Sequence, residues 1–222
     1  MRLDEAACAA AKPSYAKQLG KRAFDVVVST AALVVAFPLL AAIAVSVRLD
    51  SPGPAIFRQR RVGRHGEIFT CLKFRTMFHR ADEAVHQRAI ERLWAGERLS
   101  DDPDSAYKMN DDVRVTKVGR WLRWTSADEL PQLINVLMGD MSIVGPRPMI
   151  PYELVHLQEW HHQRHMVRPG ITGPWQVYGR GRVGIAEMLA FDVEYARNWS
   201  LLSDLWLIIL TIPAVLMRRG AR

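Results

Sequence analysis

Residues Arg123–Pro148 have the sequence RWTSADELPQLINVLMGDMSIVGPRP, and the rest of the chain is organised around this stretch. Its apolar residues recur at the spacing of one helix face: Leu130, Leu133, Ile134, Leu137 and Met138. Gly139 suits a left-handed cap at the end of that helix. Pro131 has no N–H group, so the helix N-cap cannot lie before Asp128. We therefore expect Asp128 and Glu129 at the mouth of the helix.

Two explanations fit this pair of acids. An Asp cap followed by a Glu stabilises a helix by several tenths of a kcal/mol up to about 1 kcal/mol. The same position also suits chemistry, because exposed N–H groups attract phosphate and leave a carboxylate available as nucleophile or magnesium ligand. Consecutive helical residues point in different directions, so Asp128 and Glu129 should have different roles.

Short motifs on both sides of the pair extend the pattern over nearly everything from Lys21 to about Met217. They are Lys21–Asp25, Lys73–Met77, Asp128–Leu133, Asn135–Leu137, Gly139–Ser142, Val144–Pro148, Arg168–Gly173, Gln176–Val177 and Gly179–Arg180. In this order and spacing, the chain resembles the bacterial monotopic phosphoglycosyl transferases, also called polyprenyl-phosphate hexose-1-phosphate transferases.

The resemblance implies an enzyme that moves a sugar-1-phosphate from a UDP-sugar to polyprenyl phosphate and releases UMP. Asp128 would attack the sugar-bearing β-phosphorus, and Glu129 would bind metal or orient the site. The resemblance also implies Mg²⁺, with Asp128 and Glu129 as its ligands, because one anion must approach another. The candidate substrate-binding residues are Lys73, Arg75, Arg123, Arg147, Arg168, Gln176 and Arg180.

For Arg147 and for the candidates within 168–182, the local sequence itself gives a physical argument. Prolines on both sides stiffen the loop at Arg147, whose guanidinium suits a phosphate bidentately. Residues 168–182 are rich in Gly and Arg, so backbone can approach a diphosphate while the arginines balance its charge. Asp140 matches the family motif, and we expect it to cap a turn.

The composition allows several partners. The chain has 222 residues, enough for one domain with a real core, and 30 Lys and Arg against 23 Asp and Glu give a net charge of +7. Such an excess suits lipid headgroups, nucleotides or nucleic acid without choosing among them. Cys8 and Cys71 provide no disulfide framework, so a reducing, cytoplasm-facing location is the simpler expectation.

The apolar stretch 26–47 predicts a membrane helix. Its 22 residues would reach roughly 33 Å, enough for a straight span. Pro38 divides it into halves too short to cross alone, and both flanks are basic, which places both ends on the cytoplasmic face. A bent, re-entrant hairpin satisfies both observations, and the family is anchored this way; a straight span remains the alternative. Many relatives carry Ser before the proline, where this chain has Phe37.

The expected fold class is mixed α/β. We predict a loose segment over 1–20, a re-entrant membrane helix over 21–50, and a compact cytoplasmic catalytic domain over 51–222. Within that domain, strands 56–60 and 68–74 should form a hairpin, and 81–99 should be a polar helix followed by an exposed loop over 100–110. A basic interfacial helix is expected at 151–167 and an amphipathic interfacial helix at 201–217, where a second buried hairpin or a core helix stays open.

The predicted location is the cytoplasmic face of a bacterial inner membrane, with membrane phospholipid as a further partner; a homodimer is left open. Pro174–Trp175 and Arg197–Ser200 are similar to family members that transfer galactose- or glucose-1-phosphate. Two other classes stay open. One is a non-catalytic, membrane-anchored basic scaffold whose acids only cap a helix. The other is a nucleic-acid binder, for which the stretch 26–47 would have no purpose.

Overall fold

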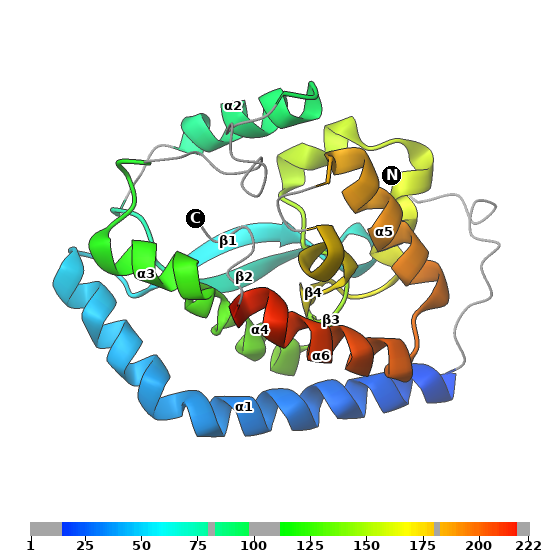
Figure 1. Ribbon diagram of the computed structural model, residues 1–222, viewed down its shortest axis with the longest axis horizontal. Coiled ribbons are helices and arrows are strands. Elements are labelled where there is room, and N and C mark those ends of the chain that lie inside the picture. Colours follow the sequence, from blue (N-terminus) through cyan, green and yellow to red (C-terminus); the bar gives the residue numbers. More distant parts are fainter. Residues whose placement is uncertain (1–14, 80–82, 98–111, 180–182, 217–222) are drawn as a thin grey trace.

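The computed structural model describes residues 15–79, 83–97, 112–179 and 183–216. These residues form a mixed helix and strand fold, as predicted (Figure 1). In chain order the elements are α1 Tyr15–Asp50, β1 Ile56–Val62, η2 Arg64–Gly66, β2 Ile68–Phe74, α2 Glu83–Trp94, α3 Lys117–Thr125, η3 Ala127–Glu129, α4 Gln132–Met138, β3 Ser142–Val144, η4 Pro151–His156, η5 Glu159–Met166, β4 Gly170–Thr172, η6 Trp175–Gly179, α5 Ile185–Asn198 and α6 Leu201–Leu216. The predicted loop 100–110 lies outside the described residues.

Helix α1 runs along one edge of the molecule and bends between its two halves (Figure 1). It has 36 residues, begins at Tyr15 rather than near residue 21, and contains Pro38. It is the one described helix that is long and apolar enough to cross a membrane, and most of its apolar part is not buried by the protein. The bend accords with the hydrogen bond that a proline removes from a helix.

The predicted hairpin is confirmed. Strands β1 and β2 pair antiparallel from Ile56 opposite Phe74 to Val62 opposite Ile68. The turn between them uses a left-handed backbone at His65 and Gly66, with φ values of 58° and 81°. Strands β3 and β4 form a second, parallel pair, which joins the central stretch to the Gly-rich segment.

The central helix ends as expected and begins slightly later. Gly139 adopts a φ of 93°, and its N–H donates to the carbonyls of Asn135 and Val136 at 3.1 Å each. The α-helix begins at Gln132, while Asp128 and Glu129 lie in a single 3-10 turn just before it. The acids are therefore at the mouth of α4, and neither is its N-cap residue.

The predicted helix over 151–167 is wrong. The chain forms two short 3-10 helices there, η4 and η5, which are separated by an extended backbone at Leu157 and Gln158. Side chains stop the helix locally, since His161 Nδ1 accepts a hydrogen bond from the Gln158 N–H at 2.9 Å. The basic residues of this segment are also largely buried. Among them, Arg164 forms an ion pair with Asp192 of α5.

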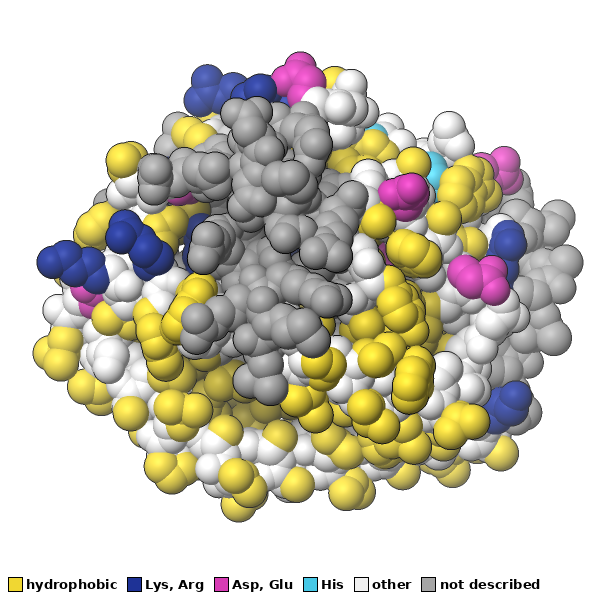
Figure 2. Space-filling model, viewed as in Figure 1, with side chains coloured by type: hydrophobic (Ala, Val, Ile, Leu, Met, Phe, Trp, Pro, Cys, Tyr) yellow, Lys and Arg dark blue, Asp and Glu magenta, His cyan; other side chains and the backbone are white. Residues whose placement is uncertain are grey.

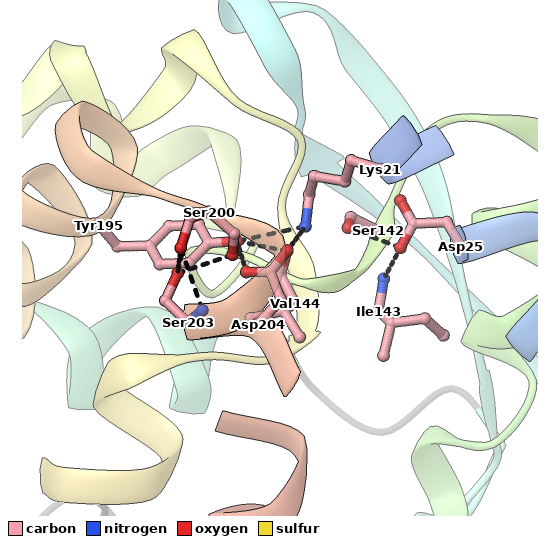
Figure 3. Close-up of polar contacts among 9 residues, drawn as sticks. All are labelled: Lys21, Asp25, Ser142, Ile143, Val144, Tyr195, Ser200, Ser203 and Asp204. Carbon is pink, nitrogen blue, oxygen red and sulfur yellow. Dashed lines mark hydrogen bonds and ion pairs between the residues drawn. The ribbon is translucent and has the colours of Figure 1, made fainter. Parts of the chain in front are cut away.

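A buried polar network joins α1 to β3 and α6 (Figure 3). The Lys21 ammonium binds the Asp204 carboxylate at 2.5 Å and donates to the Val144 carbonyl at 3.1 Å. The Tyr195 hydroxyl donates to the other carboxylate oxygen of Asp204 at 2.6 Å. One turn further along α1, Asp25 accepts hydrogen bonds from the Ser142 hydroxyl and the Ile143 N–H, both at 3.0 Å. Helices α1 and α6 are thereby joined to β3.

Apolar side chains are exposed along α1 and α6, and Figure 2 shows them over these helices at the lower edge of the molecule. Helix α6 is amphipathic as predicted, with Asp204 and Leu207 on its buried face. Its exposed residues include Leu202, Leu205, Trp206, Ile209 and Ile212. Exposed apolar surface on this scale is typical of an interaction with a membrane or another protein.

Removing one partner of the Lys21–Asp204 pair should strongly destabilise the protein. Lys21→Met leaves the Asp204 carboxylate buried without its cation, which should lower the free energy of unfolding by about 3–5 kcal/mol. Thermal or denaturant unfolding in detergent measures this loss.

The surface pair Arg92–Glu97 supplies a matched control, because both side chains are more than half exposed. Arg92→Met should cost only about 0–1 kcal/mol. The double variant Lys21→Met/Asp204→Leu should recover much of the stability, since no charge is then buried unpaired. Equal losses for Lys21→Met and Arg92→Met would contradict the role given to the buried pair.

Candidate active site

The acidic pair lies in a sharp turn between two helices. Ser126 ends α3 in a left-handed conformation with a φ of 58°, so the chain turns abruptly before η3. The Glu129 N–H donates back to the Ser126 carbonyl at 3.2 Å, which closes the 3-10 turn that carries Asp128 and Glu129. Pro131 then leads directly into α4. The turn holds both acids in place without using either side chain as the cap of α4.

A lysine from the hairpin contacts the second acid. Lys73 Nζ lies 3.0 Å from Glu129 Oε1, and both side chains are partly exposed. The contact depends on how β2 is held against α4. Asn135, which is fully buried in α4, accepts a hydrogen bond from the Leu72 N–H at 2.9 Å and donates to the Thr70 carbonyl at 2.7 Å. These two bonds fix the register of β2 and thereby place Lys73 at Glu129.

An arginine from α3 acts electrostatically on the first acid. The charge of Arg123 favours the ionised form of Asp128, and Arg123 Nε donates to Thr76 Oγ1 at 2.9 Å. Helix α3 packs tightly on this part of the chain, because a Cβ at Gly119 would lie 2.0 Å from the Thr76 carbonyl oxygen. Thr76 therefore orients Arg123 beside the acidic pair.

The environment of Asp128 changes its acidity. Burial, reinforced by the neighbouring Glu129 carboxylate, raises the pKa of Asp128 to about 6, against the lowering influence of Lys73 and Arg123. No ion pair joins the Asp128 side chain to a described residue, whereas Glu129 is paired with Lys73. Asp128 is thus the carboxylate that remains available to react. Perturbed carboxylates of this kind are frequent at catalytic sites.

The pair also fits a magnesium ion. Mg²⁺ is usually held by one or two carboxylates together with substrate phosphates and water. Asp128 and Glu129 provide such a donor pair, and the described residues contain no larger group of His, Cys, Asp or Glu arranged around a metal position. A bound diphosphate would have to complete the coordination.

Two predicted phosphate ligands have other partners in the structure. The Arg75 guanidinium is buried against the end of α1, where it donates to the carbonyls of Val47, Ser51 and Pro52 at 3.1, 2.6 and 2.8 Å. Arg168 Nε donates to the Gly139 carbonyl at 2.7 Å, at the end of α4 opposite the acidic pair. The structure therefore does not bring Arg75 or Arg168 together with Asp128.

Two of the remaining candidates, Arg147 and Gln176, follow β3 and β4 in the chain. The Arg147 guanidinium is 3.6 Å from the Glu153 carboxylate and stacks 5.9 Å from the Trp175 ring centre. Gln176 follows Trp175 in η6, and its buried Oε1 has no hydrogen-bond partner among the described residues. Arg147 thus contacts η6 through Trp175, and Gln176 is the next residue of the same helix. Arg180 lies outside the described residues. Asp140 accepts a bond from Asn135 Nδ2 at 3.3 Å, consistent with a turn role.

Sequence reasoning missed three residues that support the site. Asn135 and Thr76 position Lys73 and Arg123, and Arg61 donates to the Pro148 carbonyl at 2.8 Å, which holds the loop of Arg147. Burial and the nearby Arg147 lower the pKa of Arg61 to about 10. Helical spacing gave no signal for Asn135, because it lies off the apolar face that begins at Leu130, and the packing of α4 against β2 buries it.

Comparison with known proteins places the chain among enzymes of sugar transfer. Residues 16–218 match the family model described as bacterial sugar transferase. The chain is 41% identical to the exopolysaccharide production protein ExoY of Sinorhizobium fredii over 203 residues, which cover 91% of this chain and 88% of that protein.

Two further relatives carry more specific names. The chain is 42% identical over 207 residues to the undecaprenyl-phosphate galactose phosphotransferase of Salmonella typhimurium, covering 90% of this chain and 41% of that protein. It is 41% identical over 218 residues to the UDP-glucose:undecaprenyl-phosphate glucose-1-phosphate transferase of Caulobacter vibrioides, covering 94% of this chain and 74% of that protein. The resemblance carried by the motifs is therefore confirmed, and this chain belongs to the bacterial sugar transferase family and is a transferase.

Proposed function

We propose that this enzyme transfers a hexose-1-phosphate from a UDP-sugar to undecaprenyl phosphate, releasing UMP and starting the synthesis of a surface polysaccharide or glycoconjugate. The observation that carries the proposal is the pair Asp128 and Glu129 in a helix mouth beside Lys73 and Arg123. The names of the relatives from Salmonella and Caulobacter supply the substrate classes. A scaffold without catalysis is not favoured, because the family is one of transferases.

The reaction would proceed in two displacements at one phosphorus. A carboxylate oxygen of Asp128 attacks the β-phosphorus of the UDP-sugar, and the bond to the bridging oxygen breaks, so that UMP leaves with the electron pair. The product is an aspartyl phosphosugar. A phosphate oxygen of the lipid then attacks the same phosphorus, and the Asp128 carboxylate is released. Each step brings together two anions, so positioning and electrostatic stabilisation dominate catalysis.

The cations around the acids support this scheme. Lys73 and Arg123 would stabilise the phosphate charges, and the Lys73 contact holds the Glu129 carboxylate in place beside Asp128. Asp128 and Glu129 would hold a Mg²⁺ ion, which would supply charge neutralisation for the diphosphate. Arg147 and Gln176, which lie together near η6, are the candidates for contacts to the nucleotide or the sugar.

We propose a monotopic arrangement at the cytoplasmic face of the inner membrane. Helix α1 bends in its middle, contains Pro38, and exposes most of its apolar stretch. Basic residues flank both ends of that stretch, and a re-entrant helix keeps all of them on one side. The exposed apolar face of α6 would lie in the same interface, so the acidic pair would face a lipid phosphate at headgroup level.

Asp128→Asn should abolish the covalent step. The amide has no anionic oxygen with which to attack phosphorus, so UMP release should fall at least about 10³-fold, as for other enzymes that lose a nucleophile. Incubation with a β-³²P-labelled UDP-sugar should transfer label to the wild-type protein and none to Asp128→Asn. Glu97→Gln, the same acid-to-amide change at an exposed site, should retain both the label and the turnover. Wild-type turnover by Asp128→Asn would overturn the mechanism.

The activity should depend on the ionisation of Asp128. Because its pKa is raised to about 6, the neutral acid predominates below that pH, and kcat/KM should fall as the pH is lowered through about 6. Lys73 favours the ionised form, so Lys73→Met should move this acidic limb to higher pH, whereas Lys73→Arg should leave it near its original position. Initial rates of UMP release between pH 5 and 9, at subsaturating donor, measure the limb. An identical limb in wild type and Lys73→Met would contradict the assignment.

The sugar is accessible to a direct screen. Pro174–Trp175 and Arg197–Ser200 are similar to members that transfer galactose- or glucose-1-phosphate, and the relatives named above bear the names of both sugars. UMP release in the presence of undecaprenyl phosphate should therefore be fastest with UDP-galactose or UDP-glucose in a panel that includes the N-acetylated UDP-hexosamines. A clear preference for an N-acetylated donor would disprove this assignment.

A further inference from the structure

Three arginines from distant parts of the chain meet at the end of α4 that faces away from the acidic pair. Arg22 of α1 donates to the carbonyls of Val136 and Leu137 at 2.5 and 2.8 Å. Arg168 donates to the Gly139 carbonyl at 2.7 Å, and a Cβ added at Gly139 would lie 3.7 Å from Arg22. Arg64 joins them from the hairpin turn.

Arg64 is tied to both neighbours of the cluster. Its Nε donates to the carbonyl of Met166, two residues before Arg168, at 3.0 Å, and its NH2 group contacts Gln18, one turn before Arg22, at 3.4 Å. The positive charges of Arg64 and Arg22 both act on the Arg168 guanidinium. We call Arg22, Arg64 and Arg168 the arginine cluster.

The charge of the arginine cluster is not neutralised by carboxylates. Within the described ranges, none of its members forms an ion pair, whereas the buried cations Lys21 and Arg164 each have an aspartate. Its protein partners are neutral oxygens, helped by the partial negative charge at the C-terminus of α4. The Asp25 charge also acts on Arg168, but the two form no ion pair, and Asp25 Oδ1 accepts hydrogen bonds from Ser142 and Ile143 instead. Three neighbouring cations held in this way favour an anion from outside the protein.

Arg168 has the hydrogen-bonding capacity to hold such an anion. In the described part of the chain it forms a hydrogen bond through Nε alone, so both terminal nitrogens remain for a ligand, and its side chain is half-buried. A guanidinium that is fixed at one nitrogen can present its other donors to a phosphate at little entropic cost.

The position of the cluster on α1 indicates which anion it meets. Arg22 lies one turn before the apolar stretch that begins at Val26, and Leu19 and Val27 on either side of it are 57% and 67% exposed. If α1 enters the bilayer where its apolar stretch begins, Arg22 lies at the level of the lipid phosphates. The seven residues of α4, a length of about 10 Å, separate this point from the acidic turn.

We propose that Arg22, Arg64 and Arg168 form a binding site for the phosphate of an anionic membrane phospholipid, separate from the site of sugar-phosphate transfer. The proposal rests on the membrane location given under the proposed function, but not on the chemistry of Asp128. It assigns Arg168 to the lipid surface rather than to the nucleotide. A lipid phosphate bound here would fix the N-terminal half of α1 in the headgroup layer, and so set the height of the catalytic turn.

The test uses the full chain, purified in a neutral detergent and titrated with phosphatidylglycerol. Binding to the native state raises the unfolding temperature, so wild-type protein should show a saturable increase in Tm that phosphatidylcholine does not give. Arg168→Gln should weaken the apparent affinity about tenfold or more, because it removes a charge-assisted contact to phosphate. Arg60→Gln removes the same charge from an exposed position of β1, and should behave as wild type.

A second cluster variant and two further ligands complete the test. The variant covers the case in which Arg168→Gln does not fold, and the ligands distinguish a phospholipid from other phosphates. Arg64→Gln, in a surface turn, should show the same weakening if Arg168→Gln fails to fold. Inorganic phosphate at equal concentration should give no Tm shift, and a shift that matches phosphatidylglycerol would overturn the lipid assignment. The proposal would also fail if undecaprenyl phosphate alone were effective, or if both cluster variants responded as wild type. Asp128→Asn should keep the full Tm increase with phosphatidylglycerol. Failure of the catalytic proposal can therefore be distinguished from failure of the lipid-site proposal.

Discussion

The structure depends on a lysine buried against an aspartate. Lys21 and Asp204 lie at the junction of α1, β3 and α6, and the Tyr195 hydroxyl and the Val144 carbonyl complete their hydrogen bonds. A buried ion pair of this kind contributes less to stability than to a unique arrangement, because each charge is costly without the other. The consequence is geometric. The helix that would enter the bilayer is joined rigidly to the strand that follows the catalytic helix, so the catalytic turn has a fixed position relative to α1.

The acidic turn depends on the same kind of long-range attachment. Asp128 and Glu129 are neighbours in the chain, but their chemistry is set by Lys73 from the hairpin and Arg123 from α3. Asn135 joins α4 to the hairpin, because its side-chain amide forms two hydrogen bonds with the backbone of β2, as a neighbouring strand would. Partial burial keeps Asp128 less acidic than an ordinary aspartate, while the two cations limit that effect. The result is a carboxylate that ionises near neutral pH beside groups that attract phosphate.

The net charge of +7 serves several purposes. Arg75 and Arg164 are buried and connect elements of the fold, Lys73 and Arg123 surround the acids, and the arginine cluster lies near the expected bilayer surface. The role of each cation depends on its burial and on its hydrogen-bond partners. An arginine whose N–H donors are all used by backbone carbonyls has none left for a ligand. Basic residues thus serve the fold, the candidate site and the proposed lipid site.

Local patterns in the sequence were sufficient for the elements whose causes are local. Pro131 and Gly139 bound the central helix, two short strand-like stretches joined by a Gly-containing turn predicted the hairpin, and the apolar stretch around Pro38 predicted a bent α1. The motifs identified the family and the acidic pair. What remained depended on contacts between residues far apart in the chain.

Only the tertiary structure decided which cations lie beside the acids. Lys73 reaches Glu129 across 56 positions, whereas Arg168 is held by Gly139, 29 positions away, and Arg75 is held by the end of α1. The same holds for 151–167, whose helical composition is overridden by the caps at Gln158 and Ile150 and by the buried Arg164–Asp192 pair. Sequence spacing determines which residues share a face of one element. The partner of a side chain is determined by which element packs opposite it, and that packing is a property of the whole fold.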